Sequence, residues 1–192
     1  DDFLTKPIRA SHLISSVRIR AARFRKLRSL MTKDSMTGLF NHTTTKQFLA
    51  VELARAQRNA ASLTMAALDI DHFKVVNDTY GHGVGDRVIK ALSRLLRLRL
   101  RSADIIGRMG GEEFSAIMID TGLDEAWHVF EQIRQAFSDI EFSAGEQTFR
   151  VTISCGIAAL PDYKTAQELS DAADKALYAA KNGGRNQVVK AN

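Results

Sequence analysis

Short apolar runs of strand length alternate along this chain with longer stretches of helical periodicity, and this alternation constrains its fold most strongly. LTMAALDI, at residues 63–70, is an unbroken apolar run typical of a buried strand. Gly110 and Gly111 separate two further runs at the spacing of a tight hairpin, since glycine accepts the positive φ of such turns. Gly156, inside another run, suggests a β-bulge. Strands are expected at 63–70, 104–109, 114–120, 148–160 and 186–189.

The intervening stretches predict helices. Thr165 and Glu168 form the residue pair of a capping box before a helix that ends near Asn182. Other helices are expected at about 43–58, 88–100 and 123–137, and a short helix with a glycine-rich connection at 72–86. Helices mixed with mostly antiparallel strands predict an α+β fold, with a central sheet flanked by helices.

Composition limits the class of protein. With 192 residues, of which 45% are hydrophobic and 26% charged, the chain is long enough for one main soluble domain with a full core. The single cysteine, Cys155, excludes a disulfide framework and a cysteine-rich metal site. No apolar run approaches the roughly 20 residues of a membrane span, and no signal peptide is visible. We therefore expect a cytoplasmic protein, and the missing initial Met indicates a fragment of a longer chain.

The excess positive charge is confined to the N-terminal arm. Residues 1–33 hold nine Lys/Arg and two Asp, whereas residues 34–192 hold eighteen Lys/Arg and twenty Asp/Glu. A basic arm can contact nucleic acid or an anionic membrane. We favour a solvated helix face, because the arm lacks interleaved aromatic residues and any nucleic-acid-binding motif.

Apolar residues of the arm recur in steps of three and four, and Arg20 fills one position of this seam. Such spacing predicts a linker helix with a coiled-coil-like seam, which gives two regions, 1–33 and 34–192. The seam residues are Leu13, Val17, Phe24, Leu27 and Met31.

Acidic residues gather where predicted strands end. Asp69 and Asp71 close the 63–70 run, and Glu112 and Glu113 follow the Gly-Gly pair. If the two elements are neighbours in one sheet, Asp69 and Glu112 share a site. Such carboxylates suit Mg²⁺, whose remaining ligands come from substrate phosphates. On their own they are more simply explained as surface carboxylates at strand ends.

A glycine-rich stretch follows the first acidic pair, at Gly81, Gly83 and Gly85. Glycines let a backbone approach a ligand closely, although such a run more often marks only a loop. Asn77 and Asp86 bracket it. A carboxylate accepts hydrogen bonds from N1–H and N2–H₂ of guanine, a donor pair that adenine lacks.

Two cations, Lys181 and Arg185, lie at the end of a predicted helix, with Gly183 and Gly184 between them. They could clamp phosphates. Taken alone, they are better explained as partners of the helix dipole.

Five strings in a fixed order carry a family resemblance: DSMTGLFN, DIDHFKVVNDTYGHGVGD, DIIGRMGGEEF, VTISCGIA and ADKALYAAKNGGRN. Together, from Asp34 to about Val189, they resemble the GGDEF domain of diguanylate cyclases. The resemblance implies a nucleotidyl-cyclase-like fold with a ferredoxin-like palm. The signature here is GGEEF, in which Glu112 keeps a carboxylate where the family name has Asp, and His42 stands where the family often has Arg.

The resemblance also implies site residues. Asp69, the backbone carbonyl of Ile70 and Glu112 match ligands of Mg²⁺, with Mn²⁺ as a possible replacement, while Glu113 assists the metal or the 3′-hydroxyl. Asn77 and Asp86 match the residues that bind guanine. The implied substrate-binding set is His72, Phe73, Lys74, Asn77, Asp86, Gly110, Gly111, Lys181 and Arg185.

The implied reaction joins two GTP molecules into cyclic di-GMP and releases two pyrophosphates. Each domain of this family binds one GTP, so the resemblance implies a homodimer held by the linker helix and by facing catalytic domains. Arg101 and Asp104 match an RxxD site at which the product inhibits. An ion pair at a helix end is the simpler explanation of those two residues alone.

The first eight residues, DDFLTKPI, resemble the end of a response-regulator receiver domain, with the Lys6-Pro7 pair after its last strand.

Three functions remain in competition. An active cyclase is favoured because Asp69, Glu112 and Glu113 are all present. The alternatives are a non-catalytic module that senses GTP or cyclic di-GMP, and a nucleic-acid binder that acts through the arm.

Overall fold

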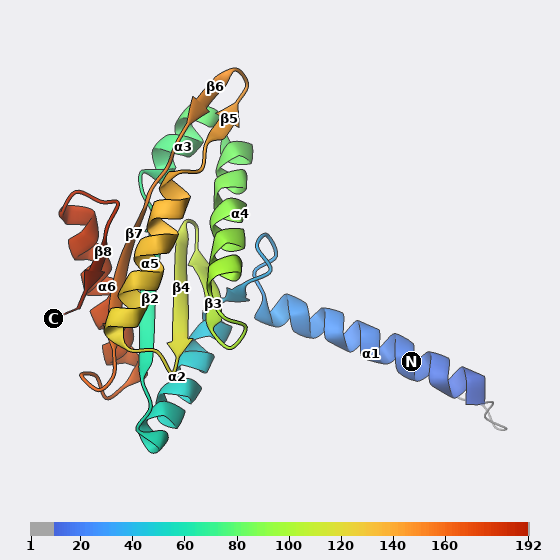
Figure 1. The fold of residues 1–192 in the computed structure, drawn as a ribbon. Helices are drawn as coiled ribbons and strands as arrows, with labels where there is room; N and C mark the ends of the chain where they lie inside the picture. Colours follow the sequence, from blue (N-terminus) through green and yellow to red (C-terminus); the bar gives the residue numbers. More distant parts are fainter. Residues whose placement is uncertain (1–9, 192) are drawn as a thin grey trace.

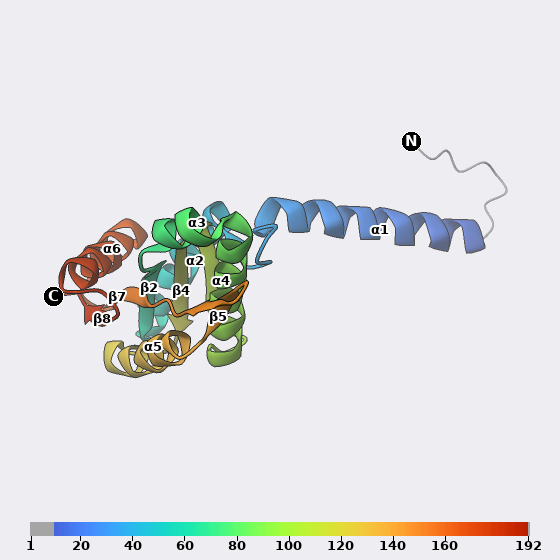
Figure 2. The same cartoon turned by 90° about the horizontal axis from the view of Figure 1, so that it is seen from above.

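The structure, a computed structural model, describes residues 10–191 and the side chains of this range except those of 10–12 and 24–30. The receiver-like string and the Phe24 and Leu27 side chains of the expected seam lie outside what is described. Helix α1 (Ala10–Thr32) projects away from the other elements (Figures 1 and 2). Its seam residues Leu13, Val17 and Met31 are 44%, 58% and 76% exposed, so little of their apolar surface packs within this chain.

A six-stranded sheet forms the centre, in the order β1-β3-β4-β2-β7-β8. The inner pairs are antiparallel, while β1 pairs with β3 and β8 with β7 in parallel. The strands are β1 (Phe40–Asn41), β2 (Leu63–Ile70), β3 (Ile105–Gly110), β4 (Glu113–Ile119), β7 (Ile153–Ala159) and β8 (Val188–Lys190). The expected α+β fold with a mainly antiparallel sheet is therefore confirmed.

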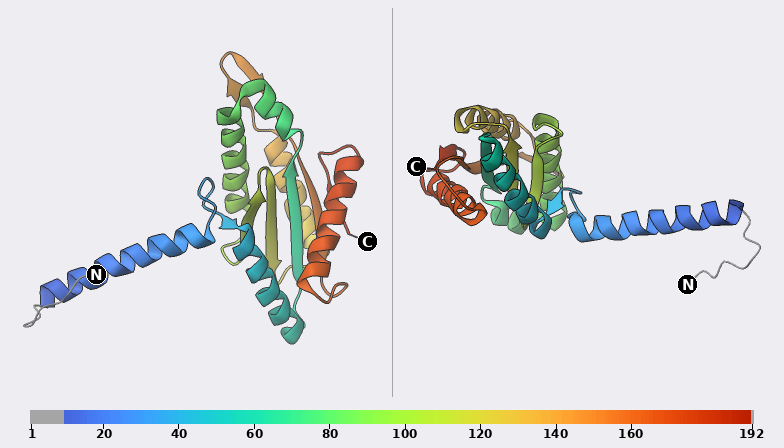
Figure 3. Two further views of the ribbon diagram at one scale, coloured as in Figure 1. Left: turned by 180° about the vertical axis from the view of Figure 1, so that it is seen from behind. Right: turned by 90° about the horizontal axis from the view of Figure 1, so that it is seen from below.

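Helices cover both faces of this sheet (Figure 3). α2 (His42–Asn59) and α6 (Ala166–Asn182) pack on the face that carries Met65 and Ala67 of β2. α4 (His82–Arg99) and α5 (Leu123–Ser138) pack on the face that carries Leu68 and Ile70. Successive strand residues point to opposite faces, so β2 is buried along its whole length and lies in the middle of three layers.

The predicted capping box at the start of α6 is confirmed, because the Thr165 side chain accepts from the Glu168 N–H and the Glu168 side chain accepts from the Thr165 N–H. Across residues 10–191, no helix has both the length and the apolar character that crossing a membrane requires.

The prediction of a glycine-rich connection within residues 72–86 is wrong. α3 (Phe73–Tyr80) is followed at once by α4, and Gly81, with a φ of 82°, is the single residue between them. Gly83 and Gly85 belong to the first turns of α4. A Cβ on Gly85 would lie 2.0 Å from Oδ1 of Asn77, so this glycine lets α3 pack closely on α4.

The expected long strand at 148–160 is divided, and Gly156 is not a bulge. β6 (Gln147–Phe149) pairs with β5 (Phe142–Ala144) in a separate hairpin, and β7 begins only at Ile153. Gly156 pairs in regular register with Ala67 of β2. A Cβ there would lie 2.2 Å from the carbonyl oxygen of Ala173, so the glycine is required for the approach of α6 to the sheet.

Candidate functional site

Asp69 lies one residue before the end of the central strand β2, opposite Glu113 of β4 and Ser154 of β7. Its side chain is buried, and its Oδ2 lies 2.7 Å from the Nζ of Lys181, in the last turn of α6. The tertiary structure therefore joins four residues that are far apart in the chain, and it places one cation, Lys181, directly on the acidic strand end.

Glu112 lies in the turn between β3 and β4. Gly110 pairs with Glu113, so Gly111 and Glu112 are the two turn residues, one position later than the expected Gly-Gly turn. Gly110 and Gly111 have φ values of 153° and 48°, which non-glycine residues rarely adopt. Because β2 and β4 are neighbours, Glu112 and Asp69 belong to the same end of the sheet. The condition that the sequence analysis set for a shared site, two neighbouring strands in one sheet, is therefore met.

The acidic residues of this sheet end influence one another. Burial raises the pKa of the Asp69 carboxyl, the Lys181 ammonium lowers it, and the charges of Glu112 and Glu113 raise it again, so that the net pKa is above its usual range. Negative charge here is only partly neutralised by Lys181. The cluster therefore favours a further cation.

The residues present fit Mg²⁺. In the part of the chain that the structure describes, no group of three or more His, Cys, Asp or Glu side chains forms a complete metal cage. Mg²⁺ does not require one, because it is usually held by one or two carboxylates together with substrate phosphates and water. Asp69, Glu112 and the Ile70 carbonyl offer only oxygen donors, which is the donor type this ion prefers.

Arg108 is a site residue that the sequence alone did not indicate. Its Nε and Nη2 donate to the carbonyl oxygen of Gly111, at 2.9 and 2.7 Å, and its Nη1 lies 3.2 Å from both carboxylate oxygens of Asp34. This arginine therefore ties the signature turn to the loop that follows α1. The GRMGGEEF string contains the arginine, but its partner lies 74 positions away.

Asp71 has a different role from Asp69. Its carboxylate is 4% exposed and accepts hydrogen bonds from the hydroxyls of Thr152 and Ser154 and from the backbone N–H of Asn186. These contacts join the end of β2 to β7 and to the segment before β8. Three bonds occupy most of the acceptor positions of a carboxylate, so Asp71 is a poor metal ligand here.

Asn77 and Asp86, the two expected guanine-binding residues, lie on facing helices. Asn77 is on α3 and packs against Gly85 of α4, the neighbour of Asp86. The ring of Phe73 also contacts this glycine position. The structure therefore places Asn77 against the residue that precedes Asp86, and a single-residue turn between two helices stands where the loop was expected.

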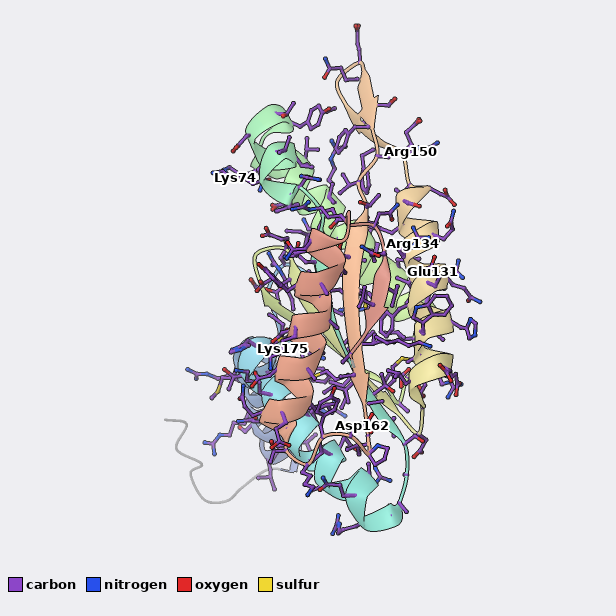
Figure 4. All side chains as sticks on the ribbon, turned by 90° about the vertical axis from the view of Figure 1, so that its left-hand side faces the viewer. Lys74, Glu131, Arg134, Arg150, Asp162 and Lys175 are labelled. Carbon is purple, nitrogen blue, oxygen red and sulfur yellow. The ribbon has the colours of Figure 1, made fainter. Side chains whose placement is uncertain are left out.

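The start of α3 carries three residues of the expected substrate-binding set. His72 has a φ of 54°, and its exposed side chain makes no capping hydrogen bond. Phe73 and Lys74 follow in the first turn, where backbone N–H groups have no partner within the helix. Figure 4 shows the Lys74 side chain pointing outward from α3. Such a helix start favours an anion.

Arg185 follows α6 in a turn with unusual backbone angles. Its φ is 62°, and that of Asn186 is 47°. The Arg185 N–H donates to the carbonyl oxygen of Ala180, at 3.0 Å, and its side chain is exposed. Lys181 and Arg185 thus flank the same turn, one beside Asp69 and one open to solvent.

A groove of about 380 Å³ lies beside the acidic cluster, between α2 and α6. Glu113 and Lys181 belong to its lining, together with Lys46 and Asp174. Burial and the neighbouring charges of Asp171 and Glu113 raise the pKa of Asp174, while Lys46 lowers it. The acidic end of the sheet is therefore open to a ligand from the α2–α6 side.

Arg101 and Asp104 do not form the simple side-chain ion pair that was the alternative to a product site. Asp104 is buried, and its carboxylate accepts from the backbone N–H groups of Arg101, at 2.8 Å, and Ile119, at 3.2 Å. The Arg101 guanidinium instead lies 2.8 Å from Glu125 of α5. Asp104 thus stabilises the local turn, and Arg101 is held by an exposed acidic partner.

A family model described as "Diguanylate cyclase, GGDEF domain" matches residues 31–187. Among curated relatives, the diguanylate cyclase DgcP of Pseudomonas aeruginosa is 39% identical over 155 residues, which are 81% of this chain and 23% of that protein. The response regulator PleD of Caulobacter vibrioides is 35% identical over 98% of this chain and 44% of its own length. The chain therefore spans less than half of these relatives.

Among solved structures, the coiled coil and GGDEF domain of DgcB from Caulobacter crescentus, in complex with c-di-GMP, superposes with a TM-score of 0.88. That protein is 29% identical, and the match covers 94% of this chain and 96% of the other. The active GGEEF domain of a diguanylate cyclase from Vibrio cholerae has a TM-score of 0.76 at 33% identity, over 79% of this chain and 97% of the other.

Proposed function

Because this chain belongs to the GGDEF family of diguanylate cyclases, we propose that it condenses two molecules of GTP into cyclic di-GMP and releases two pyrophosphates. The observation that carries this proposal is the joint position of Asp69, Glu112 and Lys181 at one end of the sheet. Carboxylates and a cation so placed suit a metal-bound triphosphate.

Guanine recognition rests on α3 and α4. We assign Asp86 to accept the N1–H and N2–H₂ donors of guanine, and Asn77 to complete the contacts to the base edge. Close packing at Gly85 supports this assignment, since it holds the Asn77 amide against the residue that precedes Asp86. An adenine ring would leave the Asp86 carboxylate without its donor pair.

The triphosphate then extends toward the end of β2. Backbone N–H groups of Phe73 and Lys74 face the terminal phosphates, and the Lys181 and Arg185 side chains neutralise their charge. Asp69, the Ile70 carbonyl and Glu112 would hold Mg²⁺, or Mn²⁺ in its place. When bound there, the ion supplies charge neutralisation at the phosphoryl oxygens and lowers the pKa of the attacking hydroxyl.

The reaction needs two domains that face each other. Each 3′-oxygen attacks the α-phosphorus of the other GTP, the α–β phosphoanhydride bond breaks, and pyrophosphate leaves with the bond electrons. Glu113, which is exposed and follows Glu112 directly, would receive the hydroxyl proton. A homodimer through α1 and the catalytic faces fits the exposed apolar side chains of that helix.

Product inhibition and phosphorylation control complete the proposal. Arg101, exposed at the end of α4, would bind the product in place of its contact with Glu125.

The sequence match to PleD covers 98% of this chain and so includes most of residues 1–33. This supports a receiver domain before the arm, whose phosphorylation would control dimerisation.

The test is incubation of the chain, cleared of bound nucleotide, with GTP and Mg²⁺, with products read by mass spectrometry. Cyclic di-GMP that grows with time supports the proposal. The Glu112→Gln variant keeps the size of the side chain but loses its charge, so it should stay folded and make no product. Product formation by this variant at the parent rate would refute the assigned metal site. Absence of both turnover and GTP binding in the parent would refute the cyclase itself.

A further inference from the structure

We propose that Asp71 is a positioning residue, which holds the turn carrying Arg185 against the end of β2 and so directs the Arg185 guanidinium toward the phosphates of the nucleotide. The proposal rests on the phosphate-binding role given to Arg185 in the proposed function. Asp71 itself contacts neither nucleotide nor metal in this assignment.

Asp71 links three segments through one buried carboxylate. Its Oδ1 accepts from the Ser154 hydroxyl at 2.6 Å, and its Oδ2 accepts from the Thr152 hydroxyl at 2.6 Å and from the Asn186 N–H at 3.0 Å. Its own N–H donates to the Thr152 carbonyl oxygen at 2.9 Å, which extends the β2–β7 ladder by one residue. The hydroxyls of Ser154 and Thr152 therefore fix the carboxylate, and its Oδ2 also holds the Asn186 backbone.

The turn that Asp71 holds is conformationally unfavourable on its own. Arg185 and Asn186 are consecutive residues with left-handed φ values, which are sterically unfavourable for a residue with a Cβ and are tolerated best by Asn. A charged acceptor on the Asn186 N–H offsets part of this cost, because hydrogen bonds to charged groups are the stronger ones.

A second contact holds the same turn from α5. Nη1 of Arg134 on α5 donates to the Asn186 side-chain oxygen at 2.7 Å, and Arg134 is itself paired with Glu131. Figure 4 labels Arg134 and Glu131 side by side on α5. Asn186 is thus held by its backbone from β2 and by its side chain from α5, and Arg185 is the residue that precedes it.

This arrangement places both cations of the site relative to one strand. Lys181 contacts Asp69 directly, and Arg185 is placed through Asp71, two residues further along the chain. Asp69 and Asp71 thus have distinct tasks: one belongs to the proposed metal site, and the other sets the distance between the metal site and the second phosphate-binding cation.

The experiment is a double-mutant cycle on the full chain with two probes, GTP and GMP, both with Mg²⁺. The variants are Asp71→Asn, Arg185→Ala and the double variant. In Asp71→Asn, the carboxylate becomes an amide. Its NH₂ group then takes, or competes for, the position of the oxygen that accepts from the Asn186 N–H. We expect each single variant to bind GTP about tenfold more weakly than the parent, and the double variant to bind GTP no more weakly than either single variant. The affinity for GMP should stay within about twofold of the parent value.

Ser154→Ala is the matched control, because it removes the hydrogen bond to Oδ1 of Asp71 and leaves both Oδ2 contacts, with the Thr152 hydroxyl and the Asn186 N–H, in place. It should lower stability without changing the ratio of GTP to GMP affinity. Arg134→Gln disturbs the turn from α5 without touching β2, and it should lower the same ratio, which keeps the test valid if Asp71→Asn folds poorly. Equal losses for GTP and GMP, or multiplied losses in the double variant, would overturn the positioning role. If the parent chain does not bind GTP, the proposed function itself fails. If the parent binds GTP but Arg134→Gln and Asp71→Asn leave the ratio of GTP to GMP affinity unchanged, only this inference is overturned.

Discussion

The guanidinium of Arg108 bridges the carbonyl oxygen of Gly111 and the carboxylate of Asp34, with two hydrogen bonds to Gly111 at 2.9 and 2.7 Å. Asp34 comes two residues after α1, and Gly111 shares the signature turn with Glu112. One half-buried side chain therefore connects the end of the linker helix to the backbone of the proposed metal site.

Arg108→Lys should lower kcat while leaving the KM for GTP within about threefold. Lysine keeps the charge but cannot make the forked contact to the Gly111 carbonyl, and small displacements of a catalytic group can reduce rates about tenfold to a hundredfold. Steady-state formation of cyclic di-GMP measures both constants. Arg97→Lys is the matched control, because Arg97 donates to the Thr37 carbonyl in the same loop without touching the turn. Equal losses in the two variants would contradict a specific role of Arg108.

Asp34 should contribute to stability in a pH-dependent way. Partial burial opposes its ionisation, but hydrogen bonds from Thr37 and the Arg108 charge outweigh this and lower the pKa of the Asp34 carboxyl. A group whose pKa is lower in the folded state stabilises the fold above its unfolded pKa of about 3.9 and loses that contribution as the pH falls through the folded value.

The measurement for Asp34 is urea unfolding of the parent and of Asp34→Asn between pH 7 and about pH 3.5. The parent should be more stable at pH 7, and the difference should shrink toward the acidic end of the range. A difference that stays constant with pH would show that the charge of Asp34 contributes nothing.

Gly85→Ala should weaken GTP binding without unfolding the chain. The added Cβ would lie 2.0 Å from Oδ1 of Asn77, and that side chain can swing away at little cost. Alanine is also the better helix former, by about 1 kcal/mol. Thermal unfolding and GTP titration separate the two effects. Gly83→Ala, whose Cβ would meet nothing within 4 Å, is the control and should bind GTP like the parent. Unchanged GTP affinity in Gly85→Ala would argue against Asn77 as a guanine contact.

Arg101→Ala should lower the affinity for cyclic di-GMP and prolong activity as product accumulates. Glu125→Gln should act in the opposite direction, because it removes the acidic partner that holds the Arg101 guanidinium at 2.8 Å. Isothermal titration with cyclic di-GMP compares the two variants with the parent. If product affinity is the same in all three, the proposed inhibitory site does not lie at Arg101.

Much of the site could be predicted from local strings. Asp69 at the end of an apolar run, Glu112 after two glycines and the capping pair Thr165 and Glu168 are short-range signals, and the structure has these elements where the strings place them. The local sequence around the glycines does not predict their roles. Gly85 and Gly156 accommodate neighbouring helices rather than a loop or a bulge, and the contacts that show this come from residues in other elements.

Local sequence patterns are enough to predict the α+β class, most of the helices and the long central strands, and the candidate acids, because periodicity and turn residues are local properties of the chain. They miss the short strand β1 and the β5–β6 hairpin. Three contacts are seen only in the folded chain: Lys181 contacts Asp69, Arg108 holds Gly111 and Asp34, and Asp71 holds the Asn186 backbone. Those contacts depend on strand order and register, which bring together residues from opposite ends of the domain. A carboxylate at a strand end has the same local sequence signal whether it meets a metal, a lysine or a backbone N–H, and only its neighbours in space distinguish these roles.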